Sequence, residues 1–294
     1  MTILMGILEE GFIYAILALG VYITYSILDF PDLSVDSTFP LGSAITASLI
    51  LLKVPALLTL PIAFLAGAMA GMVTGLIHVK LKVRDLLSGI IVMTGLYSVN
   101  LAITGDKPNV PIFGEQTIFD NPLLSKFQNS PFADVSIVII TFCIVLIVKI
   151  LLDAYLNTRS GYLLRAVGDN ETIVTSLAKD KGMVKILGLA LANGLVALAG
   201  SVYCQKQGFF ELTIGTGSIV IGLASVIIGT KVLKRFHKVK ATTAVIIGTI
   251  LYKSCVSIAI TLGMKSSYLR LITAILFLVI LVVGMGRDKQ KQGG

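Results

Sequence analysis

The sequence is poor in charged residues, which make up 14% of its 294 positions, against about 25% in an average soluble domain. Hydrophobic residues make up 55%, and the mean hydropathy is +0.93. This composition excludes a protein with a sizeable aqueous domain and indicates an integral membrane protein. The net charge of +8 is therefore interpreted as a topology signal, because basic residues gather in cytoplasmic loops, and no nucleic-acid partner is expected.

Cysteine and histidine are also scarce. Cys143, Cys204 and Cys255 lie far apart in apolar runs, without the spacing of a metal motif or a disulfide framework. The two histidines, His78 and His237, fall at predicted helix ends rather than beside a serine at the same depth. An intramembrane serine protease, which needs such a pair, is disfavoured, and neither a metal site nor a catalytic residue is expected.

The long apolar runs predict the number of membrane crossings. A transmembrane helix needs about 20 mostly apolar residues, and most Lys and Arg residues fall in every second loop. The positive-inside rule then puts the N-terminus outside and the C-terminus in the cytoplasm. We expect one all-α transmembrane domain over residues 1–294 with about nine crossings, at 8–28, 57–79, 86–104, 133–156, 183–206, 241–263 and 268–286, plus two short spans at 38–52 and 218–230.

Two polar segments interrupt these runs and resemble each other. FPDLSVDS (Phe30–Ser37) and FFELTIGT (Phe209–Thr216) each follow a full span and precede a short one, on opposite sides of the membrane. An inverted repeat gives this pattern, and in transporters such repeats place broken helices and the substrate path near the midplane. A chance similarity between two solvated turns is the alternative.

These segments supply most of the predicted substrate pathway. The N-terminal N–H groups of the short helices that follow could hold a solute carboxylate. Lys253 joins the pathway because a lysine inside a span must face protein or water, with Glu211 or an aspartate of the first segment as its expected partner. A purely structural ion pair is the alternative for Lys253. The predicted pathway residues are Asp32, Ser34, Asp36, Ser37, Glu211, Thr213, Thr216 and Lys253.

Small residues mark one helix face. Gly67, Gly71 and Gly75 are four residues apart, a pattern that lets helix backbones approach closely in lipid. Packing within the chain is favoured over a dimer interface.

A cytoplasmic segment, residues 159–182, carries the clearest family signature. It is predicted to form two short helices, the first capped by Ser160 and ending near Gly168. Its LRAVGDN stretch, followed by a glycine, a lysine and ALAG at the spacing found here, resembles the permease subunits of bacterial ABC importers for branched-chain amino acids and ribose. GFIYAILALGVYITYSILDFPDLSVDSTFPLG and LLSGIIVMTGLYSVNLAITG are similar to the tryptophan/tyrosine-type branch of that family.

The resemblance implies a non-enzymatic translocation subunit in the bacterial plasma membrane. Such a subunit pairs with a second permease copy and with cytoplasmic ABC ATPases, and it accepts a small solute, here an amino acid and possibly an aromatic one, from an external binding lipoprotein. The chain has no GxxxxGK[ST] phosphate loop, so no cofactor is expected on it, and ATP and magnesium would bind to the ATPase. The residues implied in ATPase coupling are Leu164, Arg165, Ala166, Val167, Gly168, Asp169, Asn170 and Glu171.

Two points stay open. Asp36 stands where ribose-type relatives usually have glycine, so the chemistry of the solute is not fixed by the resemblance. An ion-coupled secondary transporter is the alternative function, because Lys253 and the acidic segments could couple ions, but it leaves the cytoplasmic signature unexplained.

Overall fold

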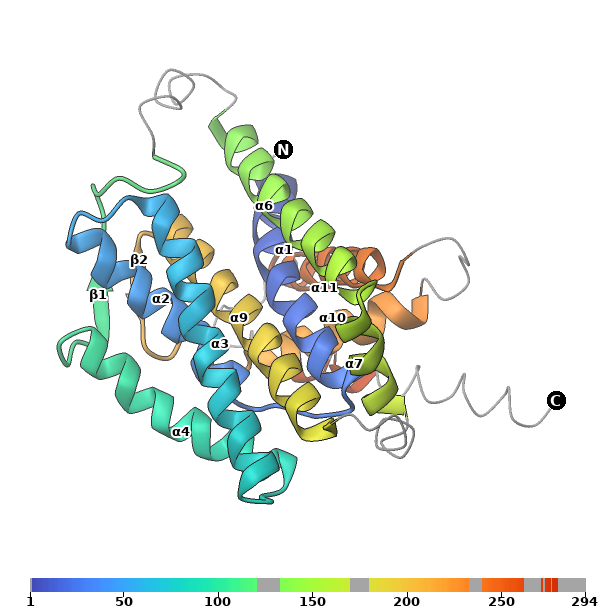
Figure 1. Cartoon of the computed structure of the whole chain (residues 1–294). Helices are drawn as coiled ribbons and strands as arrows, with labels where there is room; N and C mark the ends of the chain where they lie inside the picture. The colour runs from blue at the N-terminus through green and yellow to red at the C-terminus, as the bar shows by residue number, and fades with distance from the viewer. Residues whose placement is uncertain are drawn as a thin grey trace.

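The computed structural model describes residues 2–120, 133–169, 180–232 and 240–261, together with 271, 273–275 and 277–279. The described chain is a helical bundle with one short antiparallel ribbon (Figure 1). The helices are α1 (Thr2–Val21), which continues into the π-helical turn η1 (Tyr22–Ile27), α2 (Val35–Leu51), α3 (Ala56–Lys80), α4 (Asp85–Ile103), α6 (Ala133–Leu156), α7 (Arg159–Asp169), α9 (Lys181–Gln207), α10 (Ser218–Val232) and α11 (Ala241–Thr261).

The helices coincide with the apolar runs to within a few residues. Six helices of the described chain are long and apolar enough to cross a membrane: α1 with η1, α3, α4, α6, α9 and α11. The two predicted short spans are helices as well, α2 and α10. Within the predicted span 268–286 the structure describes only residues 271, 273–275 and 277–279, which are helical, so it does not establish nine crossings. The protein is a multi-pass, all-α membrane protein.

The apolar side chains that the bundle does not bury lie on its outer helices. Leu57 and Leu65 on α3, Leu87 on α4, and Ile139 and Leu151 on α6 are all more than half exposed. In water such a surface would be unfavourable, whereas lipid tails are as apolar as leucine. These faces are therefore the ones that meet the hydrocarbon.

Helix α9 forms the centre of the bundle, between α1, α2 and α3 (Figure 1). Gly67 and Gly71 of α3 lie so close to α9 that an added Cβ would overlap its backbone carbonyls, and Gly42 of α2 is in the same position. The small-residue pattern on α3 thus packs within the chain, which confirms the favoured interpretation. Such close backbone contact replaces the hydrophobic driving force that helices lack in lipid.

The two ends of the bundle differ in character. One end carries the antiparallel ribbon of β1 (Asn109–Pro111) and β2 (Phe209–Glu211), with Asn109 opposite Glu211; we call it the strand end. The opposite end carries the loop 81–84 after α3, the helix α7 and the start of α9 (Figure 1). This second end is rich in Lys and Arg, and we call it the basic end.

Candidate functional site

The two matching polar segments meet inside the bundle. The carboxylate of Asp36, in the first turn of α2, accepts hydrogen bonds from the backbone N–H of Gly217 at 3.0 Å and of Ile219 at 2.9 Å, at the start of α10. Gly215 packs against the Asp36 carbonyl so closely that a side chain would not fit. The free N–H groups and positive dipole end of a helix N-terminus favour such an anion. The beginnings of the two short helices are thereby joined.

This contact corrects one expectation. We expected the N-terminal N–H groups of the short helices to be open to a solute carboxylate. In the structure, two of the N–H groups at the start of α10 are already bonded to Asp36. At the start of α2, the N–H of Ser34 donates to Asp32 at 2.9 Å. The protein's own carboxylates occupy both positions, because each lies within a few residues of a helix start and needs donors at that depth.

Asp32 and Ser34 belong to a buried polar network on α9. The Asn193 side chain donates through Nδ2 to Asp32 Oδ2 at 2.7 Å and accepts through Oδ1 from the Ser34 hydroxyl at 3.1 Å. Asp32 is 1% exposed and Ser34 is fully buried. Buried polar groups linked in this way fix the position of the segment that carries them. The network ties the first polar segment to the middle of α9, away from the cavities described next.

Four predicted pathway residues line one cavity. It has a volume of about 360 Å³ and lies between α2, α4 and the segment 212–217. Asp36 and Ser37 line it from α2, and Thr213 and Thr216 from the opposite segment. Tyr97 of α4 is half exposed beside them. On the α4 side, the Asn100 side chain donates to the Ser37 carbonyl at 3.0 Å, the interhelical hydrogen bond expected of an intramembrane asparagine.

Glu211 lies at the strand end rather than among buried polar groups. It is the last residue of β2, it is exposed, and it accepts a hydrogen bond from the Thr213 hydroxyl at 2.7 Å. The β1–β2 ribbon holds it opposite Asn109. Glu211 therefore marks one end of the segment 212–217, and Asp36 meets the other.

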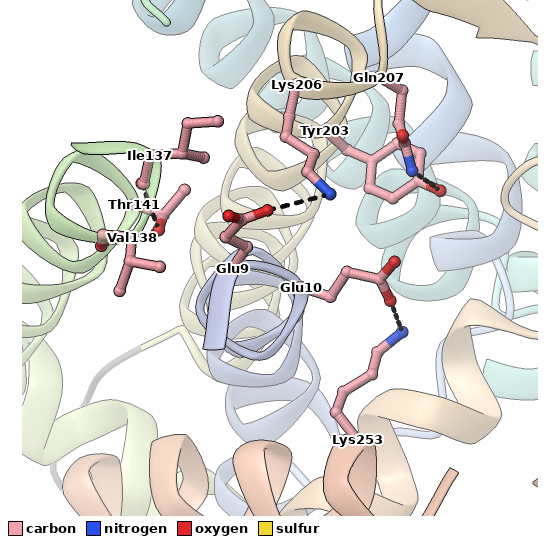
Figure 2. Close-up of polar contacts among 9 residues, drawn as sticks. All are labelled: Glu9, Glu10, Ile137, Val138, Thr141, Tyr203, Lys206, Gln207 and Lys253. Atoms are coloured by element: carbon pink, nitrogen blue, oxygen red, sulfur yellow. Dashed lines mark hydrogen bonds and ion pairs between the residues drawn. The ribbon is translucent and has the colours of Figure 1, made fainter. Parts of the chain in front are cut away.

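Lys253 pairs with Glu10 of α1, not with Glu211 or an aspartate of the first segment as we expected. Its Nζ lies 3.0 Å from Glu10 Oε2 (Figure 2). It also lies 3.7 Å from the centre of the Tyr14 ring. A second pair joins the neighbouring Glu9 to Lys206 of α9 at 3.3 Å (Figure 2). Because α1 packs between α9 and α11, its two successive glutamates reach lysines on both helices.

Helix α7 makes the contact that bears on the predicted coupling segment. Leu164 and Val167 are buried, Ala166 is half buried, and Arg165 and Asp169 are exposed. Gly168 packs against the carbonyl of Ile27, at the end of η1, where a Cβ would overlap it. The helix is capped by Thr158, which accepts from the Gly161 N–H at 3.3 Å, and not by Ser160, because the helix begins two residues earlier than expected, at Arg159.

Asn170 and Glu171, with the second predicted helix of this segment, lie outside the described residues, and so does His237. The described half of the coupling segment is an amphipathic helix with its apolar face against the bundle. Its polar face is left for other contacts.

The comparisons with known proteins agree with this architecture. Residues 3–282 match the family model described as branched-chain amino acid transport system / permease component. The chain belongs to this family. The permease is 42% identical to the tyrosine transport system permease protein of Clostridioides difficile over 97% of its own length and 92% of the relative's. It is 28% identical to the ribose import permease protein of Escherichia coli K12, over 98% and 86% of the two chains. No solved structure matches.

Three residues of the permease's polar interior were missed in the sequence. Asn193 is a lone amide in an apolar run. Because a polar side chain is costly in lipid unless it has a partner, its position alone predicts a hydrogen-bonding partner inside the bundle. Glu9 and Glu10 stand side by side in the first apolar run. Two successive carboxylates inside a span-length apolar run also predict two basic partners, which the structure supplies.

Proposed function

We propose that the chain is the translocation subunit of an ATP-driven importer in the bacterial plasma membrane. Two permease copies would pair with two cytoplasmic ABC ATPases and receive solute from an external binding protein. The family membership supports the transport role. The 42% identity to a tyrosine transport system permease protein supports an amino acid, and an aromatic one, as the solute.

One observation carries the proposal: α7 packs directly on the segment that leads into the polar site. Gly168 contacts the Ile27 carbonyl, and Leu164 meets Leu28 around Gly188 of α9. The chain then runs from Leu28 through Asp32 to Asp36, which holds the start of α10. A displacement of α7 by a bound ATPase would therefore be transmitted along a continuous set of packed groups to both short helices.

The orientation follows from charge. In the proposal the basic end faces the cytoplasm, because Lys and Arg are retained on that side, so α7 faces the ATPase. The strand end then faces outward, with Glu211 at its surface and the C-terminus inside. The cavity of Asp36, Ser37, Thr213 and Thr216 would lie along the path that the solute takes.

The test is uptake into proteoliposomes that contain the permease with the ATPase and the binding protein of its own genome. We expect labelled L-tyrosine or L-tryptophan to accumulate only when ATP is present on the side of the membrane that carries the ATPase. An ATPase variant that cannot hydrolyse ATP should abolish this accumulation. Accumulation driven by a proton or sodium gradient, without ATPase, would instead establish the secondary transporter and overturn the proposal.

A further inference from the structure

A second cavity lies on the other side of the segment 212–217. It has a volume of about 640 Å³, is partly open, and is lined by residues of α1, α9, α10 and α11, by the segment 211–217, and by Thr273 and Ala274. Thr213 and Thr216 line both this cavity and the 360 Å³ cavity. The segment 212–217 is therefore the wall between them.

The charges of this second cavity suit a zwitterion. Among its described lining residues, Lys253 is basic and Glu10 and Glu211 are acidic. The Lys253 ammonium has three donors, and its nitrogen lies 3.0 Å from a Glu10 carboxylate oxygen (Figure 2). Another side of the ammonium faces the Tyr14 ring. The Glu10 side chain is 39% exposed, against 12% for Lys253. A ligand carboxylate can meet the lysine and a ligand ammonium can meet a glutamate, whereas the negative balance disfavours anions.

The same cavity is lined by three tyrosines, Tyr14, Tyr203 and Tyr252. The rings of Tyr14 and Tyr203 pack edge to face, 5.8 Å apart. A cavity with aromatic walls and a few convergent polar groups is the usual form of a small-molecule site.

Tyr252 adds a phenol hydroxyl to the lining of this cavity. The residue is 1% exposed. The polar group beside its hydroxyl is Thr273, another lining residue, at a geometry outside that of a normal hydrogen bond. A phenol hydroxyl can both donate and accept, so it can also bond to a polar atom of a bound solute.

We propose that this cavity is an intra-subunit binding site for a zwitterionic aromatic amino acid, held by Lys253, Glu10 and the Tyr252 hydroxyl. The inference rests on the proposed function for its substrate class, and it adds a site that is separate from the cavity beside Asp36. The solute would pass from one cavity to the other across the wall of Thr213 and Thr216.

The test is saturation-transfer NMR of L-tyrosine and L-tryptophan with the full chain in lipid nanodiscs, a method that detects binding down to millimolar affinity. The chain contains no tryptophan, so ring signals of L-tryptophan have no counterpart in the protein. We expect transfer to the ring protons of both amino acids. Tyramine, which lacks the carboxylate, and 3-(4-hydroxyphenyl)propionate, which lacks the ammonium, should bind more weakly, the propionate most weakly.

Lys253→Met and Lys206→Met form a matched pair, because each breaks a Lys–Glu contact with α1 but Lys206 does not line the cavity. We expect Lys253→Met to weaken binding about tenfold or more, the factor that loss of one charge-assisted hydrogen bond gives. Lys206→Met should leave the dissociation constant for the amino acid within about twofold of the wild-type value. Equal effects of the two variants would show a general loss of structure and overturn the proposal.

Tyr252→Phe is the second variant, because it removes only the hydroxyl. We expect about fivefold weaker binding of L-tyrosine, the factor that one neutral hydrogen bond gives, without a lower thermal unfolding midpoint of the ligand-free protein. Unchanged affinity, or no transfer to the wild-type protein at millimolar ligand, would refute the site. Binding without ATP-driven uptake would instead contradict only the proposed function, and uptake without binding only this inference.

Discussion

Replacement of Asp36 should loosen the junction between the two short helices. Its carboxylate accepts two backbone N–H bonds at the start of α10, at 3.0 and 2.9 Å, and hydrogen bonds to a charged group contribute about 1.5–3 kcal/mol each. Loss of an N-terminal cap costs about 0.5–2 kcal/mol when water can replace it. We therefore expect Asp36→Ala to lower the free energy of unfolding by about 2–4 kcal/mol, a value between these limits. Asp36→Asn keeps one acceptor oxygen and should lower it by about half as much.

The assay is thermal unfolding of the purified permease in detergent. One kcal/mol corresponds to a shift of about 2 °C in a chain of this size, so Asp36→Ala should lower the midpoint by roughly 4–8 °C and Asp36→Asn by about half as much. Asp29→Asn is the matched control: Asp29 is exposed and has a φ of 52°, a conformation that asparagine also adopts. Equal unfolding midpoints for the wild type and both Asp36 variants would refute the claim that the Asp36 carboxylate stabilises the contact between the two short helices.

Three other predictions concern packing, the buried network and orientation. Gly71→Ala should destabilise the protein by about 1–3 kcal/mol, because the new methyl group would overlap the Leu189 carbonyl. Gly95→Ala is the control and should not destabilise it, because nothing lies within 4 Å of an added Cβ there. Equal thermal unfolding midpoints for these two variants would contradict this. Asp32→Asn should reduce uptake about tenfold in a complex that still assembles; normal uptake would count against it. A cysteine at Asn109 should react with an impermeant maleimide in intact cells and one at Asp169 only after permeabilisation, and the reverse would overturn the orientation.

Much of the fold follows from local sequence. The spans could be placed because a helix in lipid must satisfy its own backbone and be apolar along its whole length. The spacing of Gly67 and Gly71 likewise indicated a close helix contact. The likeness of Phe30–Ser37 to Phe209–Thr216 correctly marked both segments as the entries to short helices, because such breaks need polar residues where the chain leaves and re-enters a helix.

The partners of the polar groups could not be predicted in the same way. Lys253 pairs with Glu10 because α11 packs beside α1, and neither helix alone carries information about which helix is its neighbour. Asn193 reaches Asp32 and Ser34 because close contacts at Gly42 bring α2 against α9. Helix adjacency and rotation decide such contacts, and they depend on packing over the whole chain.

The most direct test of the account is the amount of solute accumulated per ATP hydrolysed by the complete importer, in the wild type and in Gly168→Leu. Leucine at this position would push α7 away from the Ile27 carbonyl. Coupling between sites is typically worth a factor of about 5–150, so we expect ATP hydrolysis to persist in Gly168→Leu while accumulation of L-tyrosine falls at least about tenfold. Accumulation at the wild-type ratio in Gly168→Leu, or wild-type accumulation without ATP hydrolysis, would contradict the central claim.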